Sequence, residues 1–127
     1  MPRVLIVEDN ELNRDMLSRR LMRRGWEVSI AEDGLKGVQA AQRDCPDVIL
    51  MDLSLPVVSG WDATRRIKEI PRFSSTPIVA LSAHAMMEDK ASAEAAGCDE
   101  FATKPVQFEQ LITTMNALIE ERDRRGH

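Results

Sequence analysis

The sequence predicts an α/β fold in which a parallel five-stranded sheet lies between two layers of helices. Short apolar segments alternate with longer segments of helical periodicity, in five successive pairs. Several apolar segments lack a regular polar-apolar alternation, which indicates strands that are covered on both faces. The expected strands are RVLIV (3–7), EVSI (27–30), VILM (48–51), PIVAL (77–81) and EFAT (100–103).

Helical patterns fill the intervals, at about 10–24, 34–43, 60–70, 86–96 and 107–122. The apolar stripe expected to be buried in the last helix consists of Phe108, Leu111, Ile112, Met115, Leu118 and Ile119. The corresponding stripe of the first helix consists of Leu12, Met16, Leu17 and Leu21. Gly25 and Gly97 stand where left-handed caps would end the first and fourth helices.

The succession of strands and helices also predicts how the strands are ordered. Right-handed crossovers cover both faces of a parallel sheet only if the chain reverses direction across it, so we predict the doubly wound, flavodoxin-like order 2-1-3-4-5. In this order the first and third strands are neighbours, and ligands bind beyond their carboxyl ends. Asp52 follows the buried segment VILM at this point, although a buried carboxylate is costly without a partner.

Length and composition indicate one soluble domain of 127 residues. A net charge of -4, with 43% apolar and 30% charged residues, argues against direct binding to nucleic acid. No apolar run approaches the roughly 18 residues of a membrane span, and acidic residues come too early for a signal peptide, so we expect a cytoplasmic protein. Cys45 and Cys98 lack the spacing of a redox or metal pair and are expected to be free, partly buried thiols.

Polar side chains follow the strands at their carboxyl ends, namely Glu8, Asp9, Asp52, Ser82 and Lys104. Each alone has a simpler explanation, such as a helix cap or a solvated loop charge, but their convergence at one edge of the sheet favours a site. Neighbouring carboxylates repel one another unless a hard cation binds them, and Mg²⁺ leaves positions for phosphate oxygens. A carboxylate can attack phosphorus, while Lys104 and Ser82 can bind phosphoryl oxygens. The pattern therefore suits phosphoryl transfer.

Four segments resemble response-regulator receiver domains of two-component signalling, in order and in spacing: VLIVEDNELNR, DVILMDLSLPVVSGWDATRRI, PIVALSA and TKP. The resemblance covers nearly all of residues 3–122. It implies that Asp52 accepts a phosphoryl group in a reaction that needs Mg²⁺, with Mn²⁺ as a possible substitute. The implied metal ligands are Glu8, Asp9, Asp52 and the backbone carbonyl of Ser54. Such a chain is a signalling phosphoacceptor that catalyses only its own phosphorylation and slow dephosphorylation.

The resemblance further implies a switch. Ser82 would move toward the phosphorylated Asp52, and Phe101 would rotate into the space that Ser82 leaves. Because Phe101 lacks a phenolic hydroxyl, its motion would act through packing alone. The altered surface would comprise the helix at 86–96, the strand at 100–103 and the helix at 107–122.

Three further features are implied by the resemblance near the acceptor. The side chains of Ser54 and His84 are expected to flank the phosphoryl group and tune its lifetime, with ordinary exposed loop residues as the alternative. The bond between Lys104 and Pro105 is expected to be cis, which is uncommon in proteins.

The expected partners are a histidine kinase or histidine phosphotransfer protein as donor and a downstream protein as target, without nucleic acid or membrane. VEDNELNR and AAGCDEFATKP resemble receivers of hybrid histidine kinases and single-domain regulators of the DivK type. We expect one stand-alone receiver over 1–127, with a core at about 3–122 and a polar tail at 123–127; a fragment of a hybrid kinase is the alternative. The first helix also carries a basic group that is either simply solvated or a docking face: Arg19, Arg20, Arg23 and Arg24.

Rival classes of protein fit the sequence less well. A flavodoxin-like cofactor module would need phosphate-binding loops, but Glu8 and Asp9 repel phosphate unless a metal intervenes. No G-x-x-x-x-G-K-[ST] motif is present, and a haloacid-dehalogenase-type phosphatase would have an aspartate where Ser54 stands. A binding module independent of phosphorylation would normally have lost the acceptor, the acidic pair or the lysine.

Overall fold

The computed structural model describes residues 2–83 and 87–125. The strands are β1 (Arg3–Val7), β2 (Glu27–Ala31), β3 (Val48–Asp52), β4 (Ile78–Ser82) and β5 (Glu100–Thr103). The helices are α1 (Glu11–Arg23), α2 (Gly34–Asp44), α3 (Gly60–Glu69), α4 (Met87–Ala96) and α5 (Phe108–Arg124), with a short 3-10 helix at Pro71–Phe73. Every predicted strand and helix is present.

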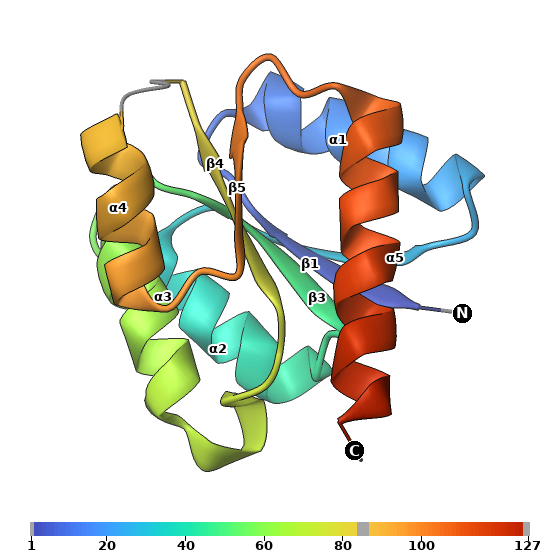
Figure 1. Cartoon of the computed structure of the whole chain (residues 1–127). Helices are drawn as coiled ribbons and strands as arrows, with labels where there is room; N and C mark the ends of the chain where they lie inside the picture. The colour runs from blue at the N-terminus through green and yellow to red at the C-terminus, as the bar shows by residue number, and fades with distance from the viewer. Residues whose placement is uncertain (1, 84–86, 126–127) are drawn as a thin grey trace.

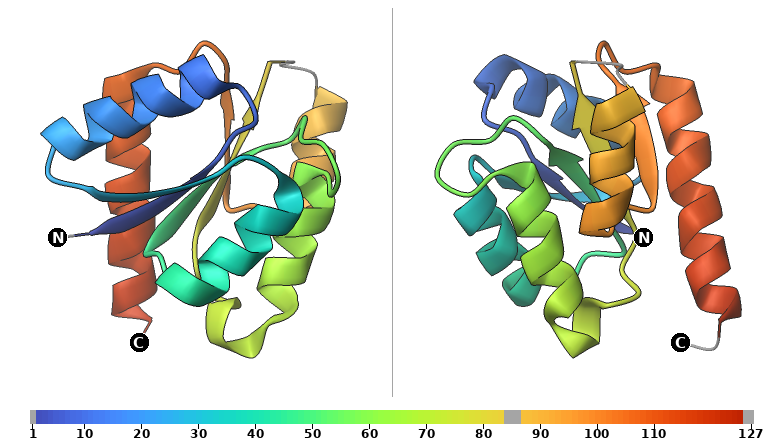
Figure 2. Two further views of the ribbon diagram at one scale, coloured as in Figure 1. Left: turned by 180° about the vertical axis from the view of Figure 1, so that it is seen from behind. Right: turned by 60° about the vertical axis from the view of Figure 1, so that its left-hand side comes forward.

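All the strands are parallel and lie in the order β2-β1-β3-β4-β5, which confirms the predicted topology. Helices α1 and α5 cover one face of the sheet, and α2, α3 and α4 cover the other (Figure 1; the right-hand view of Figure 2 shows the layers from the side). Strands β1 and β3 are adjacent, with Val7 and Met51 in register. Their carboxyl ends therefore open on the same edge of the sheet.

Two apolar cores fill the spaces between the sheet and its helical layers, and β3 contributes to both. Val48 and Leu50 belong to the core with α1 and α5, whereas Ile49 and Met51 belong to the core with α2, α3 and α4. Each such side chain contributes roughly 1.5–3 kcal/mol through burial. Because β3 is packed on both faces, Asp52 at its end is attached to a rigid part of the protein.

The apolar stripe predicted for α1 is wrong in its first half. Leu17 and Leu21 are buried, but Leu12 is 81% exposed and Met16 is 49% exposed. Each residue turns an α-helix by about 100°, so the row through Leu12 and Met16 lies outside the row that contacts the sheet. The stripe predicted for α5 is confirmed: its first four members are buried, and Leu118 and Ile119 are partly buried against the same core.

Caps fix both ends of α1. The Asn10 side chain accepts a hydrogen bond from the Asn13 N–H at 2.9 Å, which satisfies one of the free amides of the first turn. Gly25 follows the helix with φ +90°, and Gly97 follows α4 with φ +109°, as predicted. The chain between β1 and α1 is thereby limited to three residues, 8–10.

The end of α5 and one cysteine differ from the predictions. Helix α5 continues to Arg124, two residues into the expected tail. Arg122 supports this last turn because its guanidinium donates to the Asp47 carbonyl at 3.1 Å.

Of the two cysteines, Cys98 is buried, but Cys45 is exposed because it caps α2 at φ +46°, beyond the apolar face of that helix. Among the residues described, no helix is long and apolar enough to cross a lipid bilayer.

Candidate phosphoacceptor and metal site

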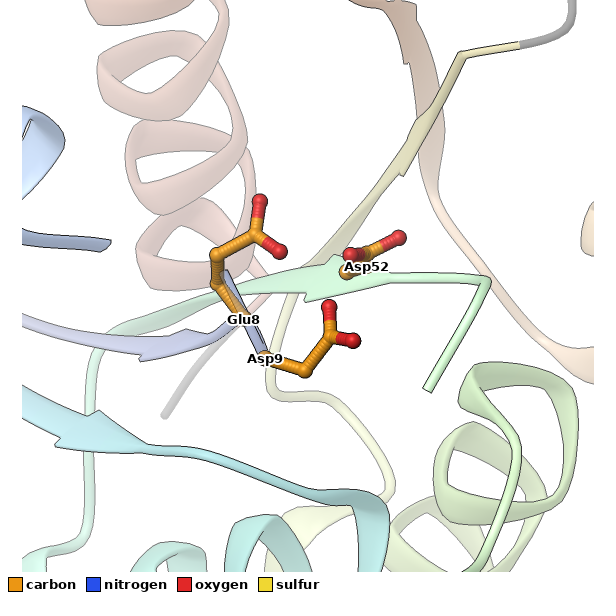
Figure 3. A group of neighbouring side chains, drawn as sticks. All are labelled: Glu8, Asp9 and Asp52. Carbon is orange, nitrogen blue, oxygen red and sulfur yellow. The ribbon is translucent and has the colours of Figure 1, made fainter. Parts of the chain in front are cut away.

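Three carboxylates meet where β1 and β3 end. Glu8 and Asp9 follow β1, and Asp52 is the last residue of β3. One oxygen from each lies within 4.8 Å of the others, and Figure 3 shows the Asp9 carboxylate turned toward Asp52. Glu8 and Asp52 are buried, whereas Asp9 is exposed. The group therefore forms the floor and the rim of a cleft whose other lining residues are Asn10, Glu11, Asn13, Ser54, Ala83 and Lys104.

Lys104, in the loop after β5, bridges two of these carboxylates. Its Nζ lies 2.7 Å from Oε1 of Glu8 and 3.1 Å from Oδ2 of Asp52. Its backbone N–H donates to the Ser82 carbonyl at 2.7 Å, which ties the loop to the end of β4. The bond from Lys104 to Pro105 is cis, as predicted. The structure thus brings the predicted lysine and the predicted acceptor into direct contact.

The proximity of these groups shifts their pKa values in opposite directions. Burial, together with the hydrogen bond to Asp52, raises the pKa of Glu8 from 4.5 to about 7, against the opposing effect of Lys104. Burial also acts to raise the pKa of Asp52, but hydrogen bonds with Glu8, the Ser54 N–H and Lys104 hold it below its ordinary value. Burial disfavours the Lys104 cation, yet its bonds to Glu8 and Asp52 leave its pKa raised. Asp52 is therefore the carboxylate that stays ionised.

The backbone around Asp52 is held from two sides. The Ser54 N–H donates to Oδ1 of Asp52 at 3.0 Å. On the other side, α3 begins at Gly60, where a Cβ atom would lie 2.2 Å from the Asp52 carbonyl oxygen. Only glycine allows this approach. Sequence reasoning did not single out Gly60 as part of the site, and the only signal available was a glycine at the start of a helical pattern.

The two residues of the expected switch lie on neighbouring strands. Ser82 is buried at the end of β4. Phe101 on β5 is half-buried, lies in register with Ala80 of β4, and packs against the core formed with α2, α3 and α4. Ser54 lines the cleft, whereas His84 lies outside the described residues. The tuning role expected for His84 stays a prediction.

Arg14 was missed by the sequence analysis. Its guanidinium Nη1 donates to the backbone carbonyl of Glu8 at 3.0 Å, so a residue of α1 holds the loop that carries two of the carboxylates. Glu8 lies before the start of α1 and Arg14 lies within it, so their spacing of six residues matches no helical or strand repeat. No sequence pattern could have revealed this contact.

Two of the four arginines at the end of α1 contact α5, namely Arg20 within the helix and Arg24 directly after it. The Arg20 guanidinium lies 4.2 Å from the centroid of the Phe108 ring, and Arg24 lies 2.6 Å from Glu109. Arg19 and Arg23 are exposed on the helix, where Arg19 pairs with Asp15 at 3.2 Å. The basic group is thus divided between residues that fasten α1 to α5 and residues that face solvent.

The donor set fits a hard divalent cation. The cluster offers carboxylate oxygens within 4.8 Å of one another, and the exposed Asp9 gives access from solvent. Without a metal, the proton on Glu8 and the positive charge of Lys104 reduce the repulsion between the carboxylates. A bound divalent cation could take over the role of the proton or of the ammonium group. Among the side chains that the structure describes, no other group of three acidic, histidine or cysteine residues is arranged to bind a metal.

Comparison with known proteins identifies the family. Residues 4–116 match the family described as the response regulator receiver domain, and the chain belongs to that family. It is therefore a receiver domain of two-component signalling. A solved structure, the receiver domain of the sensor histidine kinase PA1611 from Pseudomonas aeruginosa, superposes with a TM-score of 0.87. It is 34% identical, the match covers 94% of this chain and 98% of that one, and it has a magnesium ion coordinated in its active site cleft.

Curated relatives include proteins of different lengths. The polar-differentiation response regulator DivK from Brucella anthropi is 34% identical over 120 residues, which cover 94% of this chain and 98% of DivK. The DNA-binding dual master transcriptional regulator RpaA from Synechocystis is 35% identical over 124 residues, which cover 98% of this chain. The chain spans about half of RpaA, 52% of its length. The hybrid signal transduction histidine kinase G from Dictyostelium discoideum is 39% identical over 117 residues, which cover 90% of this chain and 3% of that protein. The predicted similarity to receivers of the DivK type and of hybrid histidine kinases is confirmed.

Proposed function

We propose that this receiver accepts a phosphoryl group on Asp52 from a histidine kinase or a histidine phosphotransfer protein, in a reaction that requires Mg²⁺ or Mn²⁺. The observation that carries the proposal is the position of Asp52. It is buried at the end of β3, bonded to Lys104, and within reach of the same cation as Asp9. Its pKa is held below the ordinary value, so it is an ionised nucleophile at neutral pH.

The residues of the cleft account for each part of the transfer. An Asp52 oxygen attacks phosphorus while the phosphorus–nitrogen bond of the donor breaks, and the electron pair leaves with the imidazole nitrogen. Lys104 bonds Asp52 in the unphosphorylated protein and would bond a phosphoryl oxygen after transfer. The Ser82 hydroxyl would donate a hydrogen bond to another phosphoryl oxygen. A divalent cation held in the cleft would supply positive charge that offsets the negative charge of the incoming phosphoryl group. The proposed ligands of that cation are Glu8, Asp9, Asp52 and the backbone carbonyl of Ser54.

The proposed output follows from the neighbouring strands. Phosphorylation changes the charge of the Asp52 side chain from about -1 toward -2 and adds oxygens that accept hydrogen bonds. Ser82, at the end of the adjacent β4, is drawn in, and Phe101 moves into the space that is left. This alters the face formed by α4, β5 and α5, which a downstream protein reads.

Two aspects of the biological context belong to the proposal. The similarity to DivK over 98% of that regulator's length favours a receiver that works without an attached output domain. The half-length match to RpaA leaves a receiver within a longer protein as the alternative. We place the reaction in the cytoplasm, because free cysteines such as Cys45 and Cys98 suit a reducing compartment.

An intact-mass assay with a small acyl phosphate tests the proposal directly. Wild type is expected to gain the mass of one phosphoryl group only when Mg²⁺ is present, and Asp52→Asn is expected to gain none. Asp62→Asn is a matched control, because Asp62 is an exposed aspartate that pairs with Arg65 on α3. Its phosphorylation should equal that of wild type.

The same assay separates the rival function. If wild type gains no mass with or without Mg²⁺, the chain is better explained as a protein-binding module that works without phosphorylation. A gain that persists in Asp52→Asn would show that another residue is the acceptor and would overturn the assignment of Asp52.

A further inference from the structure

Arg14 fixes the backbone of the loop between β1 and α1. It lies in the first half of α1 and is half-buried, and its guanidinium reaches back to donate to the Glu8 carbonyl at 3.0 Å. The N–H of the same residue, Glu8, donates to the Ala31 carbonyl at the end of β2, also at 3.0 Å. The peptide groups on both sides of Glu8 are therefore held, one by β2 and one by Arg14.

Asp9 depends on this loop for its position. It is the residue after Glu8, and one of its carboxylate oxygens belongs to the three-carboxylate cluster. Within the described part of the chain, no hydrogen bond or ion pair holds the Asp9 side chain. Because no partner holds the side chain, the backbone sets the position of its Cβ atom and thereby which positions the carboxylate can reach.

An acidic side chain, Glu32, lines the same pocket as Arg14. Glu32, in the loop after β2, forms an ion pair with Lys36. The hydrogen bond from Lys36 is the main cause that lowers the pKa of Glu32, and the positive charge of Arg14 contributes to it as well. The bond that fixes the Arg14 guanidinium is therefore the one to the Glu8 carbonyl, because Glu32 pairs with Lys36 instead.

We infer that Arg14 is a positioning residue for the divalent cation, because it holds the Glu8 carbonyl and thereby presents Asp9 to the metal. This inference rests on the proposed function. Arg14 does not reach the ion itself, and its positive charge alone would weaken cation binding. The two effects oppose each other, and the inference requires the positioning effect to be the larger, as it is when a supporting bond sets where a metal ligand lies.

Magnesium titration by calorimetry tests the inference without relying on phosphorylation. Arg14→Ala should raise the Kd for Mg²⁺ about tenfold, which is the lower end of the loss usually seen when a residue supporting a metal ligand is removed. Arg14→Lys keeps a charged donor and should recover most of the affinity. Arg23→Ala removes an exposed arginine from the same helix and should leave the Kd unchanged.

A second readout separates positioning from general damage to the fold. At saturating Mg²⁺, Arg14→Ala should be phosphorylated by an acyl phosphate at a rate within about twofold of wild type, because the filled site restores the position of Asp9. Urea unfolding in EDTA confirms that each variant is folded. If Arg14→Ala is unfolded at the assay temperature, Arg14→Met, which keeps the aliphatic stem, takes its place.

The outcomes distinguish the inference from the proposed function. An unchanged Mg²⁺ Kd in Arg14→Ala, or an equal rise in Arg23→Ala, overturns the role of Arg14 while the phosphoacceptor site stands. Absence of Mg²⁺ binding in wild type overturns the proposed metal site itself.

Discussion

The Nζ atom of Lys104 lies 3.1 Å from Oδ2 of Asp52 and at the same time 2.7 Å from Oε1 of Glu8. One ammonium group thus bonds both buried carboxylates of the cluster. A divalent cation arriving at the site must compete with it for these oxygens, and a phosphoryl group on Asp52 offers it a new acceptor. Lys104 therefore opposes metal binding and favours phosphorylation.

Lys104→Met separates these two effects. Loss of a positive charge beside the carboxylates should tighten Mg²⁺ binding by about threefold to tenfold, whereas loss of the phosphoryl contact should slow phosphorylation about tenfold or more. Calorimetry and intact-mass kinetics measure the two quantities. Lys68→Met is the control, because Lys68 is a half-buried lysine that pairs with Asp99 instead. Weaker Mg²⁺ binding together with an unchanged phosphorylation rate in Lys104→Met would contradict both assignments.

The raised pKa of Glu8 predicts how stability depends on pH without metal. Because its pKa is 4.5 when unperturbed and about 7 in the folded protein, the folded state holds the proton more tightly. Its contribution to stability is full below pH 4.5 and is lost as the pH rises through 7. The lowered pKa of Asp52 acts in the opposite direction but at acidic pH. In EDTA, the free energy of unfolding from urea titrations should therefore fall between pH 5 and 8, and Glu8→Gln should flatten this dependence.

The affinity for Mg²⁺ should rise with pH, whereas the stability of the metal-free protein falls. Because a metal ligand must be deprotonated, binding displaces the Glu8 proton, and Mg²⁺ affinity should rise by up to about tenfold per pH unit from pH 5 to 7 and level off above 8. Calorimetry in buffers of different ionisation enthalpy measures the proton released. An affinity that does not change across this range would show that Glu8 is already ionised in the free protein.

The fold and the site differ in how far they could be predicted from the sequence. Apolar segments such as VILM indicate strands buried on both faces, which need a helical layer on each side of the sheet. Two layers joined by right-handed crossovers then predict the strand order. The carboxylates were found because parallel strands end at one edge. The exposure of Leu12, by contrast, depends on which helical row meets the sheet. The contacts of Arg14 and Gly60 and the proton on Glu8 depend on distances that only the folded chain defines.

Val57 predicts a stabilising substitution in the loop between β3 and α3. Its φ is +68°, which a β-branched residue adopts only with strain, and the Val58 N–H closes a tight turn by donating to the Pro56 carbonyl at 2.8 Å. Val57 is 78% exposed, so a glycine there loses little packing. Val57→Gly should raise the free energy of unfolding by about 1 kcal/mol and Tm by roughly 3–5 °C.

Val58 provides the control for this substitution. It is partly buried against the core and is not in the left-handed region, so Val58→Gly should destabilise the protein by about 1–2 kcal/mol. Thermal unfolding of the three proteins distinguishes the cases. A lower Tm in Val57→Gly would mean that the valine side chain contributes more than its strain costs.

The exposed arginines of α1 predict a difference between two phosphodonors. Arg20 and Arg24 contact α5, whereas Arg23 and Arg19 are exposed to an acidic partner, although Arg19 also pairs with Asp15 on the same helix. The double substitution Arg19→Glu and Arg23→Glu should slow transfer from a phosphorylated histidine protein about tenfold at low salt, because it removes attraction during encounter. The effect should shrink as ionic strength rises, since surface charges are screened.

A small acyl phosphate should phosphorylate this charge-reversal variant at the wild-type rate, because a small donor does not dock on α1. Arg65→Glu is the matched control: Arg65 is an exposed arginine on α3, in the opposite helical layer, and its reversal should affect neither donor. Equal slowing with both donors would indicate a damaged active site and would contradict docking through α1. Slowing with the protein donor alone would place the partner on the face of α1 that carries Arg19 and Arg23.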